Sequence, residues 1–318
     1  MNEREDVLSL EENYAHRNIP EILSDSSIPS QQDKVMALLK EVTLINRLYG
    51  NFKEENRVLS LATEGSLESK ESESDQFLES MIAFARSAAN IHLETSLNAL
   101  NGIAILLLDL DGRPREMNLQ SLAISSLCRV AIENSLIVLW DLEETNPLKM
   151  AERGLAEFVQ NLGYLIDMEQ MQSASRSKKV LPTSKPTPSE KLLEYQSKMN
   201  DLKLEGIWLG LATAKEVSKS ENQVVGFKLN SPLPSYKEMC NKTTVGIYDS
   251  IDAFYSQLSG VIHGLRWSFE GITKSDDATR GALFAKRYID LDFLVHCLMI
   301  SIECTWRAHE RYLFAVSA

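Results

Sequence analysis

The sequence predicts an all-α protein built as a multi-helix bundle with long core helices. Three features support this fold class. Apolar residues recur at three- and four-residue spacing along most of the chain, and capping residues and prolines stand where these patterns begin and end. Strand-like composition is confined to one short stretch, VVGFKL at 224–229. A chain of 318 residues with 44% apolar residues is long enough to bury a substantial core.

Capping signals mark where the helices of the first half should begin. Ser30-x-x-Asp33 is a capping pair ahead of an apolar pattern. Asn146-Pro147 supplies a side-chain cap followed by proline at the first helical position, where a missing N–H costs nothing. We therefore expect helices over about 31–56, 76–110 and 118–144, and a further helix from Pro147 onward.

The clearest break in the helical pattern is QSASRSKKVLPTSKPTPS at 172–189. Its three prolines, many serines and four Lys/Arg residues predict a flexible basic tether. Two roles stay open for it: a solvated linker between helices, or a segment that folds on an anionic partner. Beyond it, helices are expected over about 190–205, from Ser235, over about 245–270 and over about 277–314.

The domain organisation follows from charge and composition. Residues 1–75 form an acidic N-terminal arm and helix with an exposed linker, and residues 76–318 form a helical bundle domain interrupted by the tether at 172–189. The arm region carries 16 acidic and 8 basic residues of a chain with net charge −12. An acidic surface repels phosphates, which argues against broad non-specific nucleic-acid binding. We expect the arm to contact a protein partner, and the long C-terminal helix to support a homo-oligomer.

Composition also excludes several kinds of site. The chain begins without the basic and apolar regions of a signal peptide and has no run of 18 apolar residues, so we expect a cytoplasmic protein with no membrane partner. Its four cysteines lack CxxC spacing, and neither HExxH nor a phosphate-binding glycine loop occurs, so no metal and no cofactor are predicted. We expect His296 in the core and His309 on a solvated helix face.

An arginine and a glutamate interrupt the apolar pattern of the 118–144 helix. Arg129 and Glu133 are four residues apart and therefore stack on one helix face. Burying ionisable groups without partners costs several kcal/mol, so the two must satisfy each other or serve a ligand. Two interpretations stay open: an ion pair that sets the register of the bundle, or a guanidinium oriented toward a phosphate or carboxylate.

A second polar stripe runs along the predicted 245–270 helix. Tyr255, Ser259 and His263 follow one another at four-residue spacing beside an apolar stripe. They form either a buried hydrogen-bonded ladder or part of a ligand site. No GxSxG elbow is present, so a serine nucleophile is not expected. We predict that this stripe and Arg129–Glu133 converge on one polar pocket, and we name all five residues as ligand-binding candidates.

These elements resemble those of uncharacterised bacterial all-helical proteins. In that group an R-x-x-x-E helix is followed by an aromatic turn, an E-R helix and a Y-x-x-L-S-x-x-x-H-G element. The matching residues here are Arg129 and Glu133, Trp140, Glu152-Arg153-Gly154-Leu155, and Tyr255 through His263-Gly264. The resemblance covers roughly 118–270 and implies a helical bundle.

At the level of the fold, the group is similar to the HEPN superfamily of helical domains. Many HEPN proteins are metal-independent ribonucleases of toxin and phage-defence systems, in which Arg-x(4–6)-His assists attack of the RNA 2′-hydroxyl. Arg86 and His92 match that spacing here, although Ser87 stands where Asn, Asp or His usually follows the arginine. Six residues along a helix separate the two side chains by about 120°, so one site would need two protomers or a kink.

Two functions are therefore carried forward. The first is a non-enzymatic regulatory or interaction protein of bacterial stress or phage defence, with a polar pocket inside the bundle. The alternative is a HEPN-like ribonuclease acting on RNA, a toxin or defence effector, whose catalytic pair is Arg129/His263 or Arg86/His92. Whether the chain is an enzyme is left open between them.

Overall fold

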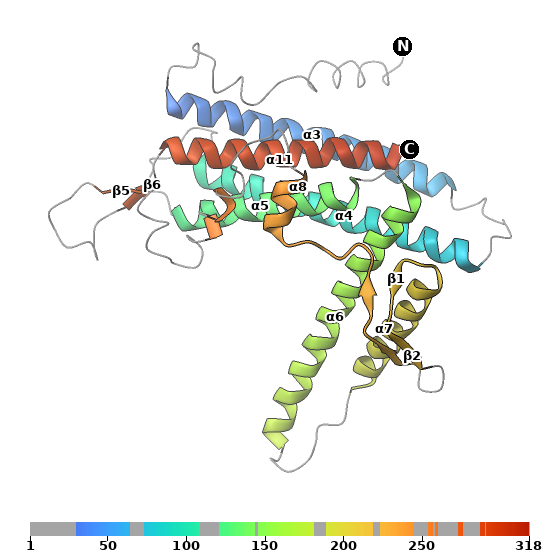
Figure 1. The fold of residues 1–318 in the computed structure, drawn as a ribbon. Coiled ribbons are helices and arrows are strands. Elements are labelled where there is room, and N and C mark those ends of the chain that lie inside the picture. Colours follow the sequence, from blue (N-terminus) through green and yellow to red (C-terminus); the bar gives the residue numbers. More distant parts are fainter. Residues whose placement is uncertain are drawn as a thin grey trace. The chain divides into compact units, whose positions relative to one another are not determined.

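The computed structural model confirms the mostly helical fold (Figure 1). It describes residues 30–63, 73–108, 121–143, 146–180, 189–218, 223–243, 254–256, 258–259, 273–275, 287–289 and 291–317. The predicted N-terminal arm over 1–29, His263 and most of the predicted 245–270 helix lie outside these ranges.

Long helices account for most of the described chain. They are α3 (Gln31–Thr63), α4 (Glu73–Leu107), α5 (Ser121–Asp141), α6 (Pro147–Val180), α7 (Glu190–Trp208), the short α8 (Tyr236–Thr243) and α11 (Leu291–Ser317). Short strands form antiparallel pairs: β1 (Ala212–Thr213) with β4 (Lys228–Leu229), β2 (Glu216–Ser218) with β3 (Gln223–Val225), and β5 (Thr273–Ser275) with β6 (Arg287–Ile289). The expected extended stretch at 224–229 thus falls in β3 and β4.

The predicted helix starts are confirmed by their capping hydrogen bonds. The Asp33 amide donates to Ser30 Oγ at 3.2 Å, and Ser30 Oγ donates back to the Asp33 carboxylate at 2.5 Å. The Leu148 amide donates to Asn146 Oδ1 at 2.9 Å at the start of α6. Local side-chain chemistry therefore decides where these helices begin.

Three helix boundaries differ clearly from the predictions. Helix α3 was expected to end near residue 56 but continues to Thr63. Helix α6 continues to Val180, into the predicted tether, because serine and lysine are tolerated in a helix and the first proline is Pro182. The C-terminal helix was expected over 277–314 but begins at Leu291, since β6 occupies Arg287–Ile289. Tyr288 and Ile289 favour extended backbone, and here they pair with β5.

The chain folds into two compact units, each drawn from segments distant in sequence. Unit 1 comprises residues 1–63, 93–136 and 236–310, and unit 2 comprises residues 64–92, 137–235 and 311–318.

A chain of buried hydroxyls joins three helices of unit 1. Ser96 of α4 lies 3.1 Å from Ser135 of α5, which lies 3.1 Å from Thr305 of α11. All three residues are fully buried. Helices α3 and α11 also lie side by side (Figure 1), with the Tyr49 and His309 rings edge-on at 6.4 Å. The register between these helices is therefore set by polar contacts inside an apolar core.

Unit 2 is centred on the packing of α6 against α7 and the first part of α4 (Figure 1). Its core contains Met81, Ala151, Leu155, Leu202, Leu211 and Ala212. Gly154 of α6 approaches α4 so closely that a Cβ there would overlap the Met81 carbonyl oxygen. Only glycine fits at this helix crossing.

Within the described ranges, one segment, Ala123–Asp141, is long and apolar enough to cross a membrane. Just over half of it, 56%, is buried inside the protein, and the core helix of a soluble protein satisfies the same criteria.

We expect Gly154→Ala to destabilise unit 2 by about 3 kcal/mol, because the added methyl group meets backbone rather than a flexible side chain. Gly163→Ala, on the same helix, is the matched control, since a Cβ there meets nothing within 4 Å. The control should instead gain about 1 kcal/mol from helix propensity. Urea unfolding of both variants checks this pair, and equal stabilities would contradict the close approach.

Candidate functional site

The predicted meeting of the two polar stripes occurs at Arg129, Glu133 and Tyr255. The first two lie one turn apart on α5, and Tyr255 lies on the helical turn 254–256, also in unit 1. Arg129 Nε donates to Glu133 Oε1 at 2.6 Å, and the Tyr255 hydroxyl donates to the same oxygen at 2.6 Å. Arg129 Nη2 donates to the Tyr255 hydroxyl at 3.3 Å. We call this closed ring of three contacts the Arg–Glu–Tyr cluster.

Partial burial gives the Arg–Glu–Tyr cluster its electrostatic character. The side chains of Arg129 and Glu133 are 20% and 17% exposed. Burial and the hydrogen bond to Glu133 raise the pKa of Tyr255. Burial lowers the pKa of Arg129, but the hydrogen bond and charge of Glu133 outweigh it, so that this pKa is raised overall. Arg129 and Tyr255 therefore both hold their protons at neutral pH.

The Arg–Glu–Tyr cluster does not use all the donors of Arg129. A guanidinium carries five N–H groups, and only those on Nε and Nη2 bond within the cluster. The guanidinium carbon also lies 5.4 Å from the centre of the Tyr255 ring, which holds its plane in place. The arrangement presents an oriented cationic fork of the kind that binds carboxylates and phosphates.

The remaining members of the second stripe are placed only in part. Ser259 is partly buried, one turn after Tyr255, beside the fully buried Leu258. His263 lies outside the described residues. The two stripes therefore meet at Arg129, Glu133 and Tyr255. The pocket itself, and its extension to Ser259 and His263, stay predictions.

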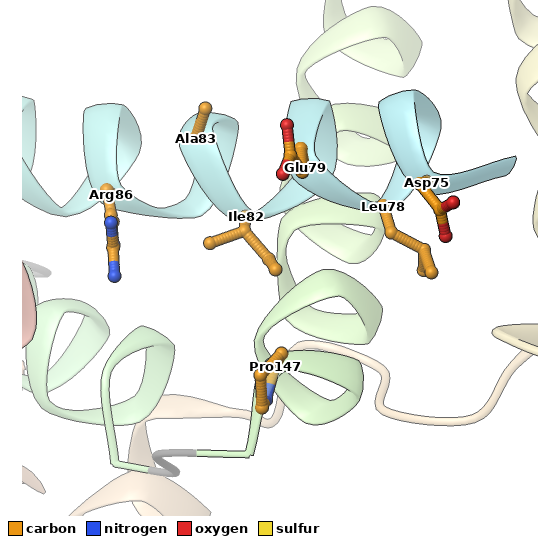
Figure 2. A pocket seen from close by; sticks show the side chains of 7 residues that line it. All are labelled: Asp75, Leu78, Glu79, Ile82, Ala83, Arg86 and Pro147. Carbon is orange, nitrogen blue, oxygen red and sulfur yellow. The ribbon is translucent and has the colours of Figure 1, made fainter. Parts of the chain in front are cut away.

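The weaker catalytic candidates, Arg86 and His92, both lie on α4 in unit 2. Arg86 lines an open pocket of about 940 Å³ (Figure 2), and its Nε is buried with no hydrogen-bond partner in the described part of the chain. His92 is not among the described residues that line this pocket. It interacts instead with Glu157 of α6: burial, the larger effect, raises the pKa of Glu157, and the charge of His92 lowers it. The two candidates thus face different surroundings, as their 120° separation on a helix requires.

Sequence reasoning missed a buried ionisable group in unit 2, the carboxyl group of Asp141. Asp141 is fully buried and both its carboxylate oxygens lack hydrogen-bond partners among the described residues. Burial, reinforced by the charge of Glu157, raises its pKa well above the ordinary range, while Arg153 lowers it. Glu157 is 4% exposed, and burial raises its pKa as well. One signal was available: Arg153 and Glu157 repeat the Arg-x-x-x-Glu spacing of Arg129 and Glu133.

Arg153 turns away from Glu157 to the end of α5. It donates through Nη1 to the Trp140 carbonyl and through Nη2 to Glu143 at 3.0 Å, and it stacks on the Trp140 ring at 5.2 Å. Arg311 donates to the carbonyls of Leu142 and Glu143. Two arginines therefore satisfy the last carbonyls of the helix, where positive charge is favoured by the helix dipole.

Both histidine expectations on α11 are wrong. His296 is exposed and hydrogen-bonds the Asp292 carbonyl at 2.6 Å, whereas His309 is 2% exposed. The reason is helical period: His309 follows the buried Ile302 by two turns and Thr305 by one, so it shares their face despite its charged neighbours. Among the described residues, no group of three or more His, Cys, Asp or Glu could hold a metal ion.

We expect Asp141→Asn to remove a pH-dependent loss of stability. The raised pKa means that the folded protein holds the Asp141 proton more tightly than the unfolded chain does. The stability that this proton gives the protein is complete below the ordinary carboxyl pKa of 3.8, and it is lost as pH rises toward the folded-state pKa of Asp141. The melting temperature of the wild-type protein should therefore fall relative to that of the variant as pH rises above 3.8 toward neutral pH. Asp167→Asn, at an exposed position of α6, is the control. A constant difference at every pH would refute the expectation.

His309 should limit stability in acid. Burial lowers its pKa from 6.5 to about 4, so stability present above pH 6.5 is lost as pH falls toward 4. Between about pH 7.5 and pH 5 the protein should lose about 2 kcal/mol that His309→Leu retains. The exposed His296→Leu serves as control in denaturant titrations at both pH values. Parallel losses in all three proteins would count against a dry, neutral His309.

Comparisons with protein-family models, curated proteins and solved structures gave no match to this chain. The site is therefore interpreted from its own geometry.

Proposed function

We propose that the chain is a non-enzymatic regulatory or interaction protein whose Arg–Glu–Tyr cluster binds the anionic group of a ligand. The observation that carries this is the orientation of Arg129. Glu133 and Tyr255 occupy its Nε and one Nη2 donor and fix the guanidinium plane, while the side chain stays 20% exposed. An oriented, partly desolvated guanidinium binds a phosphate or carboxylate more strongly than a freely rotating one.

The protonation of the Arg–Glu–Tyr cluster favours binding over catalysis. A general acid or base needs a pKa near the working pH, whereas the pKa values of Arg129 and Tyr255 are both raised above their ordinary, already high, values. The resemblance to bacterial helical proteins is the reason for expecting this binding role in stress or phage defence. Contacts through the N-terminal arm and through α11 stay predictions.

The ribonuclease alternative, with Arg129/His263 or Arg86/His92 as its pair, finds support at Arg86, whose Nε has no hydrogen-bond partner among the described residues and which lines an open pocket. The same pocket is lined by Asp75 and Glu79, whose charges repel the phosphates of RNA. This composition favours a different occupant for the pocket.

Phosphate and citrate serve as probes of the proposed anion site. Either anion should raise the melting temperature of the wild-type protein at low ionic strength, because a ligand that binds only the folded state stabilises it. Arg129→Gln should abolish the shift, and Arg129→Lys should weaken it, since lysine keeps the charge but lacks the planar fork. Lys198→Gln, which removes an exposed charge on α7, should change nothing.

Circular dichroism of each variant separates loss of binding from loss of fold. An unchanged shift in a folded Arg129→Gln protein, or no shift with either anion in the wild type, would rule out the anion site.

A further inference from the structure

The pocket at the start of α4 in unit 2 lies outside the Arg–Glu–Tyr cluster and has its own chemistry. Its volume of about 940 Å³ is within the range of small-molecule sites. Figure 2 shows Asp75, Leu78, Ile82 and Arg86 extending from the side of α4 that faces Pro147, the first residue of α6. Their spacing of three, four and four residues places them in one line along the helix.

The two ends of this line carry opposite charge. Arg86 stands at one end, with its Nε buried and without a partner among the described residues. Asp75 stands at the other end, and Glu79 adds a second carboxylate to the lining. Leu78 and Ile82, both partly buried against the core of unit 2, provide an apolar floor between the charges. A buried, unsatisfied guanidinium donor costs free energy that a ligand carboxylate would recover.

We infer that this pocket binds a short peptide with free ends, its carboxylate at Arg86 and its ammonium group at Asp75 and Glu79. Eleven residues of helix separate Asp75 from Arg86, which corresponds to about 16 Å at 1.5 Å per residue. An extended peptide of about five residues has the same length, at roughly 3.3 Å per residue. Its side chains would cover Leu78 and Ile82, so small and apolar residues fit best.

Charge separates this occupant from the other anions that an arginine can hold. An RNA segment long enough to span the line would bring negative charge to Asp75 and Glu79 as well as to Arg86, and repulsion at one end would offset attraction at the other. A zwitterion is attracted at both ends of the line at once. Recognition of a free amine and a free carboxylate also makes the site sensitive to blocking either end of the peptide.

The test titrates the full-length protein with the peptide Ala-Leu-Ala-Leu-Ala in calorimetry, in its free, N-acetylated and C-amidated forms. The free peptide should bind, and amidation should weaken binding about tenfold by removing the charge that Arg86 recognises. Arg86→Gln should weaken the free peptide by the same factor and make amidation irrelevant. Glu79→Gln should likewise reduce the effect of acetylation.

Controls keep the result interpretable. Lys198→Gln, an exposed charge elsewhere in unit 2, should bind like the wild type, and melting curves should show every variant folded. Equal binding of free and amidated peptide, no binding of the free peptide, or Arg86-dependent binding of a uridine pentanucleotide in its place would overturn the proposal.

Discussion

The hydroxyl groups of Ser96, Ser135 and Thr305 contact one another in sequence and hold three helices of unit 1 at a single register. A hydroxyl can both donate and accept, so such contacts form where water cannot reach. Sliding any one helix by a residue would leave buried oxygens unpaired, at about 1–3 kcal/mol each. With Ser135 turned toward these neighbours, Glu133 two residues earlier must point to the other side of α5. That orientation presents the Arg–Glu–Tyr cluster to Tyr255, so the candidate site depends on contacts that contain none of its own residues.

Unit 2 also buries polar groups, and several of its ionisable side chains keep atoms without partners among the described residues. In the described part of the chain, hydrogen-bond partners are missing for both carboxylate oxygens of the buried Asp141 and for the Nε atoms of Arg86 and Arg153. Such groups are uncommon in folded proteins, since each has lost water without gaining a replacement. Asp141 relieves the cost by retaining a proton, as its raised pKa indicates. Arg86 cannot become neutral in this way, because arginine keeps its charge in proteins, and it lines a pocket. Unit 1 also holds buried atoms without partners among the described residues, at Ser125 and His309, so in neither unit are all buried polar groups paired.

Features with a local cause could be read from the sequence. The caps at Ser30 and Asn146 need only a few neighbouring residues, and the pairing of Arg129 with Glu133 follows from one helical turn. Even the approach of Tyr255 was predictable, since buried charge must find a partner. Features set by distant segments were not: Asp141 looks like an ordinary helix end until Glu157 and Arg153 pack beside it. His309 was misjudged from adjacent charges when the period of α11 placed it inward.

The distribution of sulfur has a practical consequence. All four cysteines are buried thiols outside any disulfide, and every one belongs to unit 1: Cys128, Cys240, Cys297 and Cys304. Burial raises the pKa of Cys297 and Cys304, which suppresses the reactive thiolate until solvent enters. The rate at which a maleimide labels the native protein therefore measures how often unit 1 opens to solvent, with no contribution from unit 2.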